Sequence, residues 1–142
     1  MRPAAALLAL ALAPAACSHL DAAQPMAITP GQAFTLAVGG TAVLARPAVR
    51  LGFDSVVSDS RCPQGEQCVV AGEAVVRMWS QAGELPRQWH ALHLGSARTA
   101  PRIQGLALTL TALAPPPVSG QTTVPSAYRA TFMLVDDGGT ER

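Results

Sequence analysis

Two cysteines, Cys62 and Cys68, are separated by five residues in the interior of the chain. In an oxidising compartment, thiols this close together are expected to form a local disulfide. The spacing differs from the Cys-x-x-Cys spacing of redox-active thiols, so we expect a structural bond and not a redox site. Closing so short a loop removes about 2–2.5 kcal/mol of unfolded-state entropy on the chain-entropy model. The segment is therefore predicted to be a stapled corner of the domain.

Four charged residues lie in or beside this cysteine loop: Asp54, Asp59, Arg61 and Glu66. The three carboxylates, with loop carbonyls, are the kind of oxygen ligands that Ca²⁺ accepts, although they lack the fixed spacing of a calcium loop. A second hypothesis has the loop insert a protruding Arg61 into a partner, as a protease inhibitor would. In a third, Asp59 pairs with Arg61 or caps backbone N–H groups, and the corner is purely structural. We favour the third and assign no catalytic residue and no metal ligand.

Other residues with possible chemistry do not form a recognisable site. His90 and His93 fall in a segment with a period of two, which places them on opposite faces of a strand and prevents joint chelation. Trp79 and Trp89 are expected to pack in the core or at an edge and not to form a sugar-binding platform. The chain contains no nucleophile elbow, zinc-binding helix, phosphate-binding glycine loop or dinucleotide fingerprint. The sequence therefore predicts a non-enzymatic protein without a cofactor.

Residues 1–16 have the layout of an export signal. Arg2 supplies a positive start, and residues 4–13 form an apolar run. Such a run fits a signal peptide and is well short of the roughly 20 residues that span a bilayer. Cys17 follows two alanines, an arrangement that resembles a lipobox, in which the cysteine becomes the first mature residue and carries lipid. Pro14 stands where a lipobox usually has an aliphatic residue.

The predicted location follows from Cys17. If Cys17 is lipidated, Ser18 is not the Asp that marks inner-membrane retention, so an outer-membrane lipoprotein is expected. The alternative is cleavage after Ala15 by the ordinary signal peptidase, which would release a soluble secreted or periplasmic protein. The chain has ten Lys plus Arg against nine Asp plus Glu, without a run of like charge. This balance argues against a nucleic-acid partner, and membrane attachment would come from the lipid on Cys17.

Alternating apolar residues beyond residue 30 predict strands joined by Gly- and Pro-containing turns. The predicted strands cover residues 34–38, 41–45, 49–53, 74–79, 89–94, 103–113 and 128–134. Gly39-Gly40 predicts a β-hairpin between the first two strands, with Leu36 opposite Val43. We expect an all-β fold, an antiparallel β-sandwich of about seven strands, with a small β-barrel as the alternative. Residues 17–30 would be the lipidated cysteine and a flexible tether, and residues 31–142 a single β-domain.

Residues 59–72 read Asp-Ser-Arg-Cys-Pro-Gln-Gly-Glu-Gln-Cys-Val-Val-Ala-Gly. This segment resembles one found in a group of small, uncharacterised bacterial exported and lipoprotein β-domains. That group often has an aromatic residue two positions after the second cysteine, where this chain has Val70. The resemblance implies an envelope β-domain with no established activity and supplies no catalytic residues. The predicted function is a binding or structural role in the cell envelope, with an envelope protein as partner; the alternatives are a calcium or small-ligand carrier and an inhibitor-like module.

Overall fold

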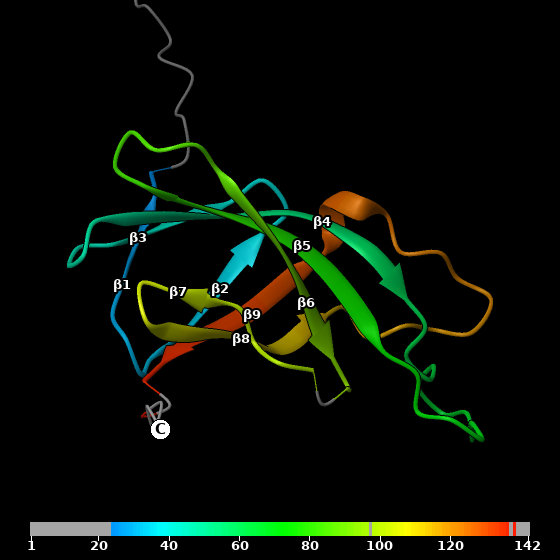
Figure 1. The fold of residues 1–142 in the computed structure, drawn as a ribbon. Coiled ribbons are helices and arrows are strands. Elements are labelled where there is room, and N and C mark those ends of the chain that lie inside the picture. Colours follow the sequence, from blue (N-terminus) through cyan, green and yellow to red (C-terminus); the bar gives the residue numbers. More distant parts are fainter. Residues whose placement is uncertain (1–23, 97, 137, 139–142) are drawn as a thin grey trace, which may run out of the picture.

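The computed structural model describes residues 24–96, 98–136 and 138, which form an all-β domain as predicted (Figure 1). Within these residues nine strands form two sheets, and Pro125–Ala127 forms a turn of 3-10 helix. The five-stranded sheet has the order β1 (Met26–Ile28), β3 (Thr41–Leu44), β4 (Val49–Asp59), β5 (Ala74–Ala82) and β6 (Gln88–Leu94). The four-stranded sheet has the order β2 (Ala33–Ala37), β9 (Arg129–Val135), β8 (Leu106–Ala114) and β7 (Arg102–Ile103).

The core lies between the two sheets and is built from one face of each strand. Alternation along β9 buries Ala130, Phe132 and Leu134, as the period of two predicts. Phe132 meets Phe53 of β4 edge to face, with ring centroids 5.8 Å apart, and Phe34 of β2 at 5.7 Å. The contact between Phe132 and Phe53 joins the two sheets, whereas Phe34 and Phe132 are register partners within the four-stranded sheet.

The predicted hairpin around Gly39-Gly40 is wrong. β2 pairs with β9, and β3 pairs with β4, so the glycines carry the chain from one sheet to the other. The Gly39 N–H donates to the Phe53 carbonyl at 2.8 Å, and Gly39 has a φ of +82°, which suits glycine. In β3, Ala42 and Leu44 are buried while Val43 is only partly covered. The predicted hairpin register placed Val43 on the buried face of its strand, whereas in β3 the buried face carries Ala42 and Leu44.

Further segments differ from the predicted boundaries. The strands predicted over residues 49–53 and 74–79 are longer and continue to Asp59 in β4 and to Ala82 in β5. Met26–Ile28, expected within the tether, forms β1 and pairs parallel with β3. The strand predicted over residues 103–113 is divided into β7 and β8 by a turn at Gln104-Gly105, where both residues have positive φ. The signal at residues 1–16 and Cys17 lie outside the described residues. No helix among the described residues is long and apolar enough to cross a membrane.

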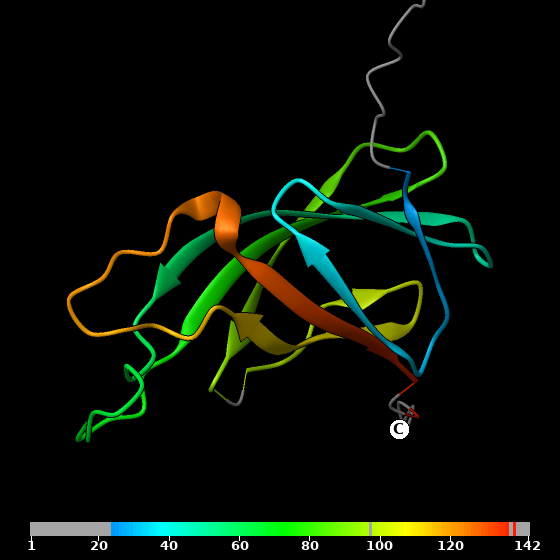
Figure 2. The same cartoon turned by 180° about the vertical axis from the view of Figure 1, so that it is seen from behind.

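The two ends of β4 lie at opposite ends of the domain. Its first part pairs with β3, which in turn pairs with β1. The cysteine loop follows Asp59 at the other end of this strand of 11 residues, roughly 30 Å away. The loop after β8 reaches the same end as the cysteine loop (Figures 1 and 2). We call this end of the domain, comprising residues 57–72 and 115–128, the loop end.

Candidate functional site

Cys62 and Cys68 form the predicted disulfide, with an S–S distance of 2.09 Å and Cα atoms 5.9 Å apart. Backbone hydrogen bonds join the two legs of the loop beneath it. The Ser60 N–H donates to the Glu73 carbonyl at 2.8 Å, and the Cys62 N–H donates to the Ala71 carbonyl at 3.1 Å. The disulfide therefore closes a loop whose base is already ordered by a short ladder.

Removing the disulfide is expected to lower the free energy of unfolding by about 2–3 kcal/mol. The double variant Cys62→Ser, Cys68→Ser relieves the constraint on the unfolded chain and leaves the backbone ladder in place. Urea unfolding of the variant, compared with reduced and oxidised wild type, measures the effect. The free energy of unfolding of reduced wild type should equal that of the variant. An unchanged free energy of unfolding in the variant would contradict a stabilising role for the bond.

Arg61 points into the domain and not towards solvent. Its Nε donates to Asp59 Oδ1 at 2.7 Å and its Nη2 to Asp59 Oδ2 at 2.6 Å. Its Nη1 also reaches the Leu113 carbonyl at 2.6 Å, and its Nη2 the Pro115 carbonyl at 3.0 Å. The side chains of Arg61 and Asp59 are only 16% and 10% exposed. Because carbonyls at the end of β8 hold the guanidinium, the loop does not present a protruding Arg61 as the inhibitor-like hypothesis requires.

Tyr128 completes this ionic junction. Its hydroxyl donates to Asp59 Oδ2 at 3.2 Å. The hydrogen bonds from Arg61 lower the pKa of Asp59, although burial alone would raise it, and Asp59 raises the pKa of Arg61. Burial is the main cause that raises the pKa of the Tyr128 phenol. The junction is therefore charged at neutral pH and joins β4 to the segments that end β8 and begin β9.

The carboxylates of the calcium hypothesis do not meet. Asp54 accepts hydrogen bonds from the Ser55 hydroxyl and from Arg77 Nε, both at 2.8 Å, and these bonds lower its pKa. Asp59 is occupied by Arg61, and Glu66 is exposed in the cysteine loop. In the part of the chain that the structure describes, no group of three or more His, Cys, Asp or Glu residues could hold a metal ion.

The segments of the loop end carry five exposed apolar side chains, which the sequence prediction did not identify. They are Val57, Val69, Val70, Val118 and Val124, with exposures from 43% to 105%. The two loops are joined directly, because the Gln64 N–H donates to the Pro117 carbonyl at 3.0 Å. A cleft of about 380 Å³ lies between the end of β4 and the proline-rich loop. Val69 and Val70, directly after Cys68, could have indicated this surface from the sequence, because apolar side chains in a short exposed loop cannot be buried there and so contribute little to stability.

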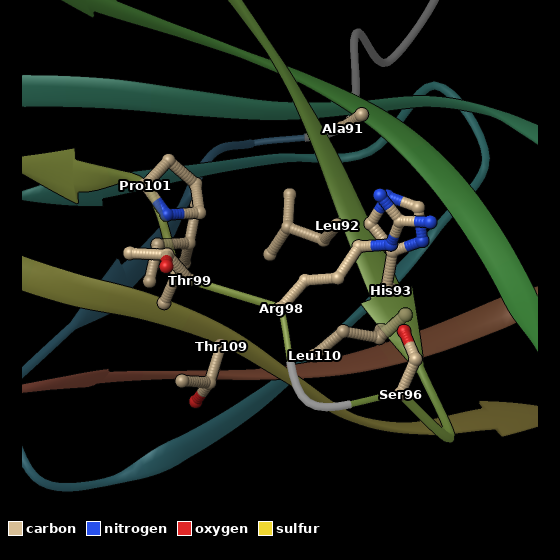
Figure 3. Close-up of a pocket in the computed structure, with 11 residues that line it drawn as sticks. Ala91, Leu92, His93, Ser96, Arg98, Thr99, Pro101, Thr109 and Leu110 are labelled. Atoms are coloured by element: carbon tan, nitrogen blue, oxygen red, sulfur yellow. The ribbon is translucent and has the colours of Figure 1, made fainter.

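A second hollow of about 190 Å³ opens between β6 and β8 (Figure 3). Leu92 and Leu110 form its apolar floor, and Arg98 extends across it towards His93 (Figure 3). His93 Nδ1 lies 3.1 Å from Glu73 Oε2, whereas His90 Nε2 lies 2.8 Å from the Ser80 hydroxyl. The two histidines therefore have separate partners. The hollow is smaller than the roughly 300–1,000 Å³ of typical ligand pockets.

Comparison with known proteins finds no matching family model, curated protein or solved structure. The function must be argued from the chemistry of this chain alone. At the loop end that chemistry combines a buried ionic junction with exposed valines.

Proposed function

We propose that this protein is a lipid-anchored cell-envelope domain that binds a protein partner through its loop end. The observation that carries the proposal is the set of five exposed valines at the loop end, one near the end of β4 and four on two loops that are fixed to each other and to the sheets. Apolar side chains gathered at one place on a surface are a common mark of a protein interface.

The loop end is preorganised for binding. The disulfide closes the cysteine loop, Arg61 fixes its base to Leu113 and Pro115, and Gln64 joins it to Pro117. Ordering flexible loops upon association costs free energy, so loops fixed in advance bind more tightly for the same contacts. Valine adds to this effect because its branched side chain has little rotamer freedom to lose.

The predicted lipid anchor at Cys17 is compatible with binding of a partner at the loop end. Cys17 precedes β1, which pairs with β3, and β3 pairs with the first part of β4; the loop end lies at the opposite end of β4. An anchor at Cys17 would leave the loop end available to a partner away from the attachment point. The charged groups at the loop end also favour binding over catalysis, because Asp59 and Arg61 satisfy each other.

Capture of the partner from the native envelope tests the proposal. The full chain is expressed with a labelled fatty acid, cross-linked in intact cells and purified. We expect the wild type to carry label and to retain a specific partner, and the variant Val69→Ser, Val70→Ser to carry label and lose the partner. Both substitutions replace exposed side chains, so the fold should be unaffected.

Leu85→Ser provides the matched control, because Leu85 is 64% exposed in the turn between β5 and β6. This variant should retain the partner. Cys17→Ser should carry no label. Labelling of Cys17→Ser, an unlabelled wild type that begins at Ala16, or equal capture by the Val69, Val70 and Leu85 variants would contradict the proposal.

A further inference from the structure

Both tryptophans of the chain lie side by side on the outer face of the five-stranded sheet. Trp79 of β5 and Trp89 of β6 are direct partners in the register between these strands. Trp79 alternates with Met78 and Ser80, whose side chains face inward and are buried. Trp79 is 8% exposed, as expected for a packed residue, but Trp89 is 54% exposed. Of the core or edge packing expected for the two tryptophans, Trp79 shows burial, whereas Trp89 is half exposed on the edge strand β6.

Trp79 forms the base of this face. Its indole lies against Gly52 of β4, where any side chain would overlap the ring. The Arg87 guanidinium covers the indole from the other side, 4.0 Å from the ring centroid. Glycine in a strand interior weakens the strand and often marks a close approach of another group, and here that group is the indole. Trp79 is thus fixed flat on the sheet beside Trp89.

Trp89 is held in place while much of its surface is in solvent. The Arg77 guanidinium lies 5.1 Å from the centroid of its ring. Asp54 fixes Arg77 in turn, through Nε at 2.8 Å and Nη2 at 2.7 Å. Cation–π contacts of this kind, at exposed sites, contribute modestly to stability, so they orient the indole more than they stabilise the domain.

Positive charge surrounds the two indoles. Arg50 is exposed on β4 and pairs in register with Gln81, two residues from Trp79. Neither Arg50 nor Arg87 has a carboxylate partner within ion-pair distance among the described residues. The nearby acidic groups are Asp54, which is neutralised by Arg77, and Glu84 in the turn before Arg87.

We propose that this face, made by Arg50, Gly52, Arg77, Trp79, Arg87 and Trp89, binds an acidic glycan. The flat apolar C–H face of a pyranose ring would pack on the exposed indole of Trp89. The planar guanidinium forks of Arg50 and Arg87 match the geometry of a uronate carboxylate. The balanced charge of the chain, ten Lys plus Arg against nine Asp plus Glu without a run of like charge, argues against a nucleic acid as the occupant of this face. The site lies on a sheet face and is separate from the loop end.

Titration of the full-length Cys17→Ser chain with polygalacturonate oligomers tests this proposal. Both tryptophans lie in the site, so binding should change the intrinsic fluorescence in a saturable manner, and salt should weaken it. Calorimetry then compares variants without relying on fluorescence. We expect Trp89→Thr to weaken binding about tenfold or more, Trp89→Phe to weaken it less, and Arg87→Gln to weaken it by about threefold to tenfold.

Val70→Thr at the loop end is the matched control and should bind the oligomers as wild type does. Equal affinity for neutral dextran, stronger binding of a single-stranded oligonucleotide, no saturable binding, or undiminished binding by Trp89→Thr would overturn the proposal. Because Trp89 is more than half exposed, Trp89→Thr should fold, and its melting temperature verifies this. Failure of the glycan test leaves partner capture by Val69 and Val70 unaffected, so the two proposals are distinguishable.

Discussion

Replacing Arg61 with methionine is expected to lower the free energy of unfolding by about 3 kcal/mol at neutral pH. The substitution leaves the Asp59 carboxylate, only 10% exposed, without its counter-charge. It also removes the donor to the Leu113 and Pro115 carbonyls. Methionine keeps an unbranched, flexible side chain, so most of the packing of the arginine stem is retained. Urea unfolding followed by tryptophan fluorescence measures the loss.

The loss should depend on pH in a defined direction. In wild type, Arg61 holds the pKa of Asp59 below its unfolded value. The stabilisation is therefore full above about pH 3.9 and disappears as the pH falls through the lower folded pKa. In Arg61→Met, the backbone N–H of residue 61 and the Tyr128 hydroxyl still lower the pKa of Asp59 and burial still raises it, but the side-chain hydrogen bonds and charge of Arg61 are lost. The pKa of Asp59 is therefore higher than in wild type, and protonation relieves the unpaired charge. The difference between wild type and variant should therefore shrink between pH 7 and about pH 4.

Arg77→Met is the matched control for this experiment. Arg77 forms the same kind of pair with Asp54, but their side chains are 54% and 29% exposed. Exposed pairs contribute about 0–1 kcal/mol, so this variant should lose little stability. Equal losses in the two variants, or a loss in Arg61→Met that does not change with pH, would contradict the assignment of Arg61 as a buried structural charge.

The strands could be predicted from the sequence because each has one buried face. Alternation identified Phe132 and Leu134 in β9 and Leu51 and Phe53 in β4 as core residues without knowledge of the fold. Pairing was harder. Gly39-Gly40 is compatible with a hairpin and with a crossing between sheets, and only the long-range partners of β2 and β3 decide between them.

The site residues were found by type but not by orientation. Arg61 was identified from its position in the cysteine loop, yet its carbonyl partners are 52 and 54 residues away in the chain. No local pattern reveals that such a side chain turns inward. Trp89 illustrates the same limit, because the alternation of residues along an edge strand does not show which face of the strand packs against the core and which is exposed to solvent. Gly52 was an overlooked signal, since a glycine inside an apolar strand suggests that a large group lies against it.

Gly72→Ala is expected to lower the free energy of unfolding by about 2–4 kcal/mol. Gly72 has a φ of +70°, which disfavours a side chain, and a Cβ there would overlap the Ser60 carbonyl oxygen. The overlap is with backbone, so the two legs of the cysteine loop must separate. Separation would break the hydrogen bond from the Cys62 N–H to the Ala71 carbonyl and displace Arg61, whose Cα lies 3.2 Å from the added atom. Thermal and urea unfolding measure the loss.

Gly65→Ala separates the cost of a positive φ from the cost of the overlap with the backbone. Gly65 has a φ of +81° but no heavy atom within 4 Å of an added Cβ, so it should lose only the conformational cost of about 1 kcal/mol. If Gly72→Ala acts by displacing Arg61, then combining it with Arg61→Met should cost less than the sum of the single losses, because both disrupt one junction. Strict additivity, or a loss in Gly72→Ala no larger than in Gly65→Ala, would show that the ladder at the base of the loop does not position the arginine.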